Sequence, residues 1–169
     1  MAARLRIIRN HGMEPKYCHN VVGGNFRLDA LQAAVLLKKM PFLGAWSGRR
    51  WEIAQYYQAE FSELAPRLQS PAEPFKESIG NRGHTYHQFV VRTAKREELR
   101  EHLRALGIGT EIYYPIPLHL QKCFAQMTAK PCRVSESAAK EVLALPIFPE
   151  LTDAEVEIVV KGVVSFFKK

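Results

Sequence analysis

The sequence predicts an α+β fold in which a small antiparallel sheet of two or three strands is covered by helices. Three observations support this prediction: helix formers dominate residues 28–64, residues 85–115 alternate between strand-like and helix-like patterns, and a capping signal precedes a final apolar helix. A strand, a helix and a strand joined by short connections favour a small sheet with helices on one face. The expected order of elements is α-α-β-α-β-α-(β)-α.

Two long helical stretches are expected near the N-terminus. Helix formers run from Leu28 to Lys39 and from Pro41 to Leu64, and their apolar residues recur at close to the helical period of about 3.6 residues. Proline lacks an amide hydrogen but is accepted in the first turn of a helix. We therefore expect a long helix pair in series, bent at Pro41, followed by a proline-rich loop over residues 65–84.

Strand patterns mark three further segments. Residues 85–93, "TYHQFVVRT", are rich in aromatic and β-branched side chains and alternate in polarity. A second strand is expected over residues 109–115, and a short third strand over residues 143–147. One face of the first strand is predicted to carry His87, Phe89 and Val91.

Capping residues predict the bounds of the remaining helices. Thr93 is expected to cap a helix that Gly107 ends, and Ser135 is expected to cap a helix that runs through "ESAAKEVLAL". Thr152 and Glu155 form a capping-box pattern ahead of the last helix. The residues expected to face inward from that helix are Val156, Val159, Val160, Val163 and Phe167.

The composition is typical of a soluble globular domain. With 47% hydrophobic and 24% charged residues, the 169-residue chain can bury one core, and no apolar run reaches the ~20 residues of a membrane span. No signal-peptide pattern is visible and three cysteines indicate no disulfide framework, so a cytoplasmic location is expected. The net charge of +7 permits an acidic partner, but no nucleic-acid-binding motif is present.

A donor-rich turn precedes the first long helix. The stretch "GGNFR" places Gly23, Gly24, Asn25 and Arg27 immediately ahead of the helix formers. The amide groups at a helix N-terminus carry about half a positive charge and bind anions, most often phosphate. Two interpretations stay open: the turn binds an anion, or Asn25 merely caps the helix while Gly24 relieves strain.

Two other stretches contain candidate ligand-binding residues. In "HTYHQ", His84 and His87 are three residues apart and face opposite sides of a strand, which does not suit a metal ion and leaves a lining role for His87 or Gln88. In "GIGTEIYYPIPLHLQ", two tyrosines, two prolines and His119 form an apolar wall with polar tips, which either packs internally or faces a ligand. No nucleotide-binding loop, hydrolase motif or zinc-ligand spacing is present, and no metal is expected.

Five segments together resemble the C-terminal part of the DegT/DnrJ/StrS-type aminotransferases: "LRIIRNHG", "GGNFRLDALQAAVL", "YHQFVVRT", "LRALGIGTEIYYPIPLHLQ" and "EVLALPIFPELT". Their order and spacing agree from residue 5 to the end of the chain. Members of this family are pyridoxal-phosphate enzymes that act on keto sugars attached to nucleotides. The resemblance implies the C-terminal small domain of a fold-type I aminotransferase over residues 25–169, with residues 1–24 as a remnant of the large cofactor-binding domain and its connecting loop.

The resemblance also implies that this chain is not competent alone. In the family, the Schiff-base lysine lies upstream of the segment that matches "LRIIRNHG", so the chain is expected to hold no catalytic residue. The intact enzyme is expected to be a homodimer that binds pyridoxal phosphate, a nucleotide-sugar and an amino donor, usually glutamate. The alternative is a non-catalytic dimerisation or regulatory module that kept the fold.

Individual site residues are carried over from the resemblance. The family's asparagine at the position of Asn25 reaches across the dimer interface to the cofactor phosphate of the other subunit, and Arg27 supports either the turn or a phosphate. Tyr114 and His119 are expected to face the nucleotide-sugar. His87 is a further candidate for substrate binding.

Overall fold

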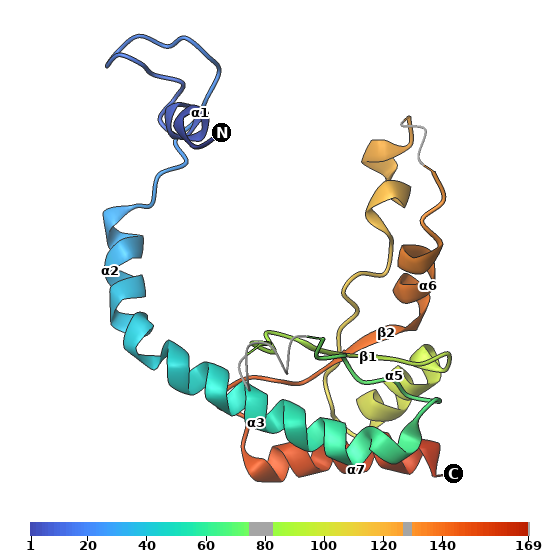
Figure 1. Ribbon diagram of the computed structural model, residues 1–169. Coiled ribbons are helices and arrows are strands. Elements are labelled where there is room, and N and C mark those ends of the chain that lie inside the picture. The colour runs from blue at the N-terminus through green and yellow to red at the C-terminus, as the bar shows by residue number, and fades with distance from the viewer. Residues whose placement is uncertain (75–82, 127–129, 169) are drawn as a thin grey trace. The chain divides into compact units, whose positions relative to one another are not determined.

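The computed structural model describes residues 1–74, 83–126 and 130–168 (Figure 1). It divides into two units, Met1–Leu43 and Gly44–Lys169, and each is described by itself. The predicted domain boundary after residue 24 stays a prediction. Residues 75–82 of the predicted loop lie outside the described residues.

Met1–Leu43 contains two helices joined by a long connection. Helix α1 spans Ala2–Ile8 and helix α2 spans Ala30–Lys39, which is followed by the 3-10 helix Met40–Phe42. Helix α1 ends at Ile8, and the connection that follows has positive φ at His11 (60°) and at Gly12 (69°). Neither α1 nor α2 contains a buried residue, so this unit has no apolar core of its own.

The predicted pair of helices in series is confirmed, with an interruption at Pro41. This proline lies in the 3-10 helix, and α3 then runs over Leu43–Phe61. The start of the first helix differs from the prediction. It begins at Ala30 rather than Leu28, because the carboxylate of Asp29 caps it.

The sheet of Gly44–Lys169 has two antiparallel strands, β1 (Phe89–Arg92) and β2 (Val142–Leu145). In their register Phe89 lies opposite Leu145, and both side chains are buried. All four residues of β2 are buried, whereas burial alternates along β1. The two observed strands therefore agree with the prediction of a small antiparallel sheet of two or three strands.

Residues 109–115 do not form the predicted second strand. Only Glu111 pairs, through an isolated bridge to Ala144 on the edge of β2. The chain then bends, and the two prolines of "YPIP" have no amide hydrogen with which to extend a ladder. The segment predicted as a third strand, 143–147, corresponds to β2, which makes it the second strand of the sheet.

The first strand is shorter than predicted. Phe89 and Val91 are fully buried on one face of β1, as expected, but His87 lies in a bend before the strand and is exposed. The cause is Tyr86, whose φ of 46° is incompatible with extended backbone. The prediction that His87 shares a face with the two buried residues is therefore wrong.

The described residues of this unit also form the helices α5 (Arg96–Ala105), α6 (Arg133–Glu141) and α7 (Asp153–Phe167). Figure 1 shows α3, α5 and α7 on the same side of the two strands. Side chains from these helices and from both strands form one buried cluster, which is the core of the unit. Further 3-10 helices are Ser62–Leu64, Leu118–Leu120 and Lys122–Phe124.

Two predicted helix starts are wrong. Helix α5 begins after Lys95, and the hydroxyl of Thr93 accepts a hydrogen bond from the Lys95 amide at 3.2 Å without capping the helix. Ser135 lies inside α6, which begins at Arg133. Helix α6 also ends at Glu141, because the four residues after it pair with β1 and are buried.

Helix α7 has the predicted capping box. The hydroxyl of Thr152 accepts a hydrogen bond from the Glu155 amide, and the Glu155 carboxylate accepts one from the Thr152 amide at 2.8 Å. Every side chain predicted to face inward from this helix is buried: Val156, Val159, Val160, Val163 and Phe167. The C-terminal helix is therefore predicted correctly in its start and in its buried face.

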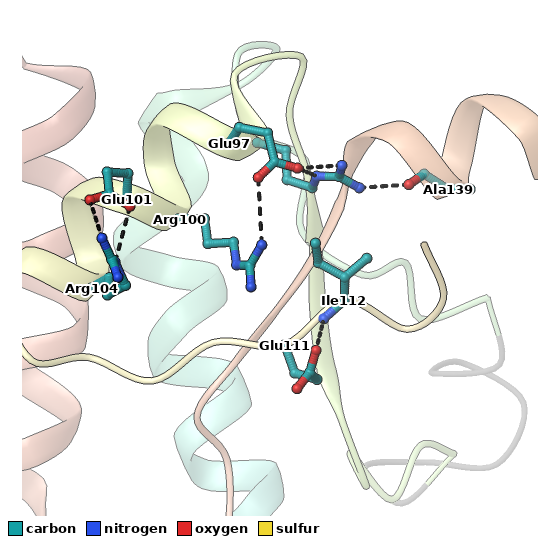
Figure 2. A network of polar contacts seen from close by, with 8 residues as sticks. Glu97, Arg100, Glu101, Arg104, Glu111, Ile112 and Ala139 are labelled. Atoms are coloured by element: carbon teal, nitrogen blue, oxygen red, sulfur yellow. Dashed lines mark hydrogen bonds and ion pairs between the residues drawn. The ribbon is translucent and has the colours of Figure 1, made fainter. Parts of the chain in front are cut away.

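Polar contacts connect α5 to its surroundings (Figure 2). The Glu101–Arg104 pair on α5, at 2.7 Å, is exposed and contributes little to stability. Arg96 reaches further, because its guanidinium donates to the carbonyl oxygen of Ala139 on α6 at 2.6 Å.

Among the described residues, no helix combines the length and the apolar character that crossing a membrane requires.

Candidate functional site

The turn that holds Asn25 is built on two glycines. At Gly12, a Cβ atom would lie 1.7 Å from the carbonyl oxygen of Val21, and at Gly23 it would lie 2.4 Å from the carbonyl oxygen of Ile8. A side chain at either position would clash with backbone atoms. The two glycines therefore allow the segment after α1 and the segment before α2 to lie against each other.

These two segments pair in antiparallel fashion. Asn10 and Asn25 form an isolated bridge. Three backbone hydrogen bonds of 3.0 Å surround it, from the amide of His11 to the Gly24 oxygen, from Gly24 to Ile8 and from Phe26 to Arg9. The backbone on both sides of Asn25 is thereby held in one conformation.

The side chains of Asn25 and Arg27 are exposed on this turn. The carboxamide of Asn25 has no hydrogen-bond partner among the described residues, which leaves its two N–H groups available to a ligand. The Arg27 guanidinium donates from Nη1 to Oδ1 of Asn10 at 2.5 Å. In this structure Arg27 therefore supports the turn, while its other N–H groups are engaged in no hydrogen bond with a described residue.

The N-terminus of α2 is capped by Asp29 and not by Asn25. The carboxylate of Asp29 accepts a hydrogen bond from the Leu31 amide at 2.7 Å, and the side chain of Gln32 accepts one from the Asp29 amide at 3.3 Å. This capping box places a negative charge at the N-terminus of α2. Asn25 is therefore not the cap, and a phosphate at this turn would depend on the side chains of Asn25 and Arg27.

A second candidate region lies in Gly44–Lys169. It is lined by residues 113–118, called the tyrosine segment below, and by residues of α6. A cavity of about 490 Å³ lies there, and Tyr114 lines it. Its walls also include Tyr113, Ile116, Leu118, Gln121 and Ser135. The cavity thus has apolar walls with a few hydroxyl and amide groups, which is the composition of many small-molecule sites.

His87 lines a neighbouring but separate cavity of about 340 Å³, together with Gln88 and Glu111. Tyr113 lines both cavities and connects the regions of His87 and Tyr114. The sequence interpretation did not single out Tyr113. The one sequence feature that could have indicated Tyr113 is its place beside Tyr114 in an apolar, proline-bounded segment. That feature does not show which of the two adjacent tyrosines lines a cavity.

His119 lines neither of these cavities. Its Nε2 lies 3.1 Å from Oε1 of Glu136, and the same oxygen accepts a hydrogen bond from the Cys132 amide at 3.0 Å. The hydrogen bond to His119 and the one from the Cys132 amide lower the pKa of Glu136 below its usual value. His119 thus joins the 3-10 helix Leu118–Leu120 to the start of α6.

The described residues contain no group of three or more His, Cys, Asp or Glu side chains placed to hold a metal ion. The described part of the chain therefore offers two candidate regions, the Asn25 turn in Met1–Leu43 and the tyrosine cavities in Gly44–Lys169. Each is defined within its own unit.

The model of the DegT/DnrJ/EryC1/StrS aminotransferase family matches residues 1–164. The chain belongs to this family. Among relatives, it is 41% identical to a "Pleiotropic regulatory protein" of Geobacillus stearothermophilus, over 99% of this chain and 45% of that protein. It is 40% identical to the dTDP-3-amino-3,4,6-trideoxy-alpha-D-glucose transaminase of Streptomyces venezuelae, over 89% of this chain and 39% of that enzyme.

Solved structures of family members have the same fold. DesV of S. venezuelae superposes with a TM-score of 0.86 at 37% identity, over 99% of this chain and 44% of DesV. NtdA of Bacillus subtilis, solved with bound cofactor PMP, gives a TM-score of 0.82 at 26% identity, over 96% of this chain and 38% of NtdA. The family fold predicted from the sequence is confirmed, and the chain spans less than half the length of these relatives.

Proposed function

We propose that this chain is the C-terminal small domain of a pyridoxal-phosphate-dependent aminotransferase that acts on keto nucleotide-sugars. The observation that carries the proposal is the family match over residues 1–164, combined with relatives that are more than twice as long. The names of several of these relatives describe transaminases of nucleotide-linked sugars. Glutamate is the proposed amino donor, and the cytoplasm is the proposed location.

The residues of the Asn25 turn fit a phosphate group. Asn25 offers an exposed carboxamide that has no hydrogen-bond partner among the described residues, and Arg27 adds a positive charge two residues away. Neutral and charged N–H donors of this kind are common ligands of phosphate oxygens. When bound, pyridoxal phosphate supplies the electron sink for amino-group transfer. Asn25 would hold the phosphate of a cofactor in the other subunit of a homodimer, with Arg27 beside it.

The tyrosine segment is proposed to face the nucleotide-sugar. Tyr114 is exposed and lines a cavity with apolar walls, and Tyr113 and His87 line the cavity next to it. His119 was expected to face the substrate directly. Its contact with Glu136 favours a different contribution, in which His119 holds the segment that carries Tyr114.

The chain alone is proposed to be inactive, because the Schiff-base lysine of the family would lie in the part of the enzyme that this chain does not include.

A second candidate, a non-catalytic regulatory or dimerisation module, is favoured by the name "Pleiotropic regulatory protein" of one relative. An immunoblot with an antibody against this chain helps to separate the two candidates, because it gives the mass of the natural gene product. A product near 19.3 kDa favours a free-standing module. A product more than twice as large is then tested for amino-group transfer to a keto nucleotide-sugar, because the regulatory relative is itself more than twice as long as this chain.

Replacement of Asn25 by alanine tests the proposed function in an enzyme that contains both the cofactor domain and this chain. A hydrogen bond to a charged group contributes roughly 1.5–3 kcal/mol, so the dissociation constant for pyridoxal phosphate should rise about ten- to a hundredfold. Unfolding measured by urea should change little, because Asp29 rather than Asn25 caps α2. Unchanged cofactor affinity would remove Asn25 from the proposed site.

Mixed dimers test whether Asn25 acts across the interface. Asn25→Ala subunits are combined with subunits that lack the cofactor lysine. The site that keeps the lysine then receives its asparagine from the lysine-less subunit, so one near-normal site should reappear. If heterodimers form but no activity returns, donation across the interface is wrong for this protein.

A further inference from the structure

We propose that Asn10 is a positioning residue that holds both Asn25 and Arg27 in the arrangement a phosphate requires. The inference rests on the proposed function, because it assigns Asn10 a task at the same site. Asn10 lies fifteen residues before Asn25 in the sequence but directly opposite it in the turn. It contacts no ligand in this proposal and acts through its two neighbours.

The first contact of Asn10 is made by its backbone. Asn10 and Asn25 form the antiparallel bridge, and the Asn10 amide donates to the Ile7 oxygen at 3.0 Å, so the bridge is joined to the end of α1. On the other side, the Met13 amide donates to the Asn10 oxygen at 3.2 Å. The backbone at Asn25 therefore lies against the backbone at Asn10, which is itself joined to the end of α1.

The second contact is made by the side chain. Oδ1 of Asn10 accepts the hydrogen bond from Nη1 of Arg27 at 2.5 Å, and Asn10 is half-buried whereas Arg27 is exposed. A free arginine side chain has many rotamers, and an anion that binds it must restrict them. Because Asn10 already restricts Arg27 in the folded turn, that loss of freedom does not count against anion binding.

The atom of Asn10 that accepts the hydrogen bond from Arg27 is an uncharged amide oxygen. A carboxylate in its place would change the net charge of the turn. Aspartate at position 10 would hold Arg27 equally well but would neutralise its positive charge. Asparagine restricts the guanidinium and leaves that charge available to an anion. The side chain at position 10 therefore combines a rigid turn with a net positive charge, which is the combination a phosphate site needs.

Three variants of the enzyme that contains the cofactor domain test the positioning itself: Asn10→Ala, Asn10→Asp and the control Asn20→Ala. Asn20 lies in the same connection, and its side chain donates to the Glu14 oxygen instead of contacting the turn. Nuclear magnetic resonance relaxation of the Arg27 Nε–H group reports the order of its side chain. Asn10→Ala should make Arg27 mobile, while Asn10→Asp and Asn20→Ala should leave it ordered. If Arg27 is as ordered in Asn10→Ala as in the unchanged chain, the proposal is wrong.

The enzyme with its cofactor domain tests the consequence. The dissociation constants of pyridoxamine phosphate and of pyridoxamine, which lacks the phosphate, are compared in each variant. Asn10→Ala should weaken pyridoxamine phosphate about threefold to tenfold and leave pyridoxamine unchanged. Asn10→Asp should also weaken only pyridoxamine phosphate, although Arg27 stays ordered, because its charge is neutralised. Equal weakening of both ligands would indicate a general structural defect and would contradict the proposal.

Asn25→Ala separates a failure of this inference from a failure of the proposed function. If Asn25→Ala weakens pyridoxamine phosphate and Asn10→Ala does not, the positioning role of Asn10 is wrong while the phosphate site stands. If Asn25→Ala has no effect, the phosphate site itself is wrong, and Asn10 then positions nothing that binds the cofactor. The double variant Asn10→Ala, Asn25→Ala should weaken pyridoxamine phosphate by about the sum of the two single effects, because the backbone bridge between residues 10 and 25 is kept when the Asn10 side chain is shortened.

Discussion

Tyr57 on α3 is fully buried, yet its side chain ends in a polar group. Its hydroxyl donates to the carbonyl oxygen of Pro146 at 2.9 Å, and its ring packs against Phe61 and Phe89 with centroid distances of 5.6 and 5.1 Å. Burial raises the pKa of Tyr57 well above its usual value, so the hydroxyl stays protonated and donates at neutral pH. One residue thus joins α3 to the segment after β2 through packing and a hydrogen bond.

Tyr57→Phe should lower the free energy of unfolding by about 1–2 kcal/mol, because the ring is kept but the Pro146 oxygen loses its partner. Urea unfolding followed by circular dichroism measures the change. Tyr56→Phe is the matched control, since Tyr56 is 41% exposed and its loss of a hydroxyl should have little effect. Equal stability of the two variants would show that the Tyr57 hydrogen bond contributes nothing.

Helix α7 shows how a short local pattern determines an element. The Thr152–Glu155 capping box was visible in the sequence, and the structure places the helix start and the buried face as predicted. The hydrogen bonds from the Thr152 hydroxyl and amide lower the pKa of Glu155. A carboxyl group whose pKa is lower in the folded state stabilises the fold above its unfolded pKa, and this contribution is lost as the pH falls through the lowered pKa.

Thr152→Ala should cost about 1 kcal/mol of unfolding free energy at pH 7, because one amide of the first turn loses its acceptor. Part of this difference should disappear as the pH falls below 4.5, the ordinary pKa of a glutamate, because protonation of Glu155 weakens a second hydrogen bond, from the Thr152 hydroxyl to the Glu155 carboxylate, in the unchanged protein. Urea unfolding at several pH values measures both effects. Thr152→Ser keeps the hydroxyl and should behave like the unchanged chain, so a loss as large as that of alanine would contradict the capping role.

Other elements could not be located from local patterns. Asn25 and Asp29 are both good capping residues, and only the observed contact of Asp29 with α2 shows which one is used. The stretch "ESAAKEVLAL" favours helix throughout, but its last four residues form β2. Pairing with β1 and complete burial outweigh a weak helix preference, and neither can be read from a window of ten residues.

At the scale of the whole molecule, the two units differ in how they are stabilised. Gly44–Lys169 has a continuous core of helices and strands. In Met1–Leu43, all of which the structure describes, Gly12 is the only buried residue. Helix α2 has ten residues, fewer than the ~12–15 that an isolated helix needs to be even marginally stable in water. Its apolar side chains are exposed, among them Leu31 at 76% and Val35 at 52%.

The isolated chain should therefore self-associate through α2, since soluble monomers rarely expose a contiguous apolar surface of this kind. Sedimentation velocity over a range of concentrations should show a shift to larger species. The double variant Leu31→Gln, Val35→Gln should reduce that shift, whereas Ile158→Gln, at an exposed position of α7, should not. A strictly monomeric chain at high concentration would count against this expectation.

The sequence by itself determined the family, the α+β class, the helix pair interrupted at Pro41, and the cap and buried face of α7. These features depend on local patterns or on the order of several motifs along one chain. Only the tertiary structure decided that Asp29 rather than Asn25 caps α2, that residues 109–115 form one bridge instead of a strand, and that Asn10 contacts both Asn25 and Arg27. The reason is physical: these outcomes depend on pairing between segments far apart in the sequence, and the energy of such pairing is not contained in either segment alone.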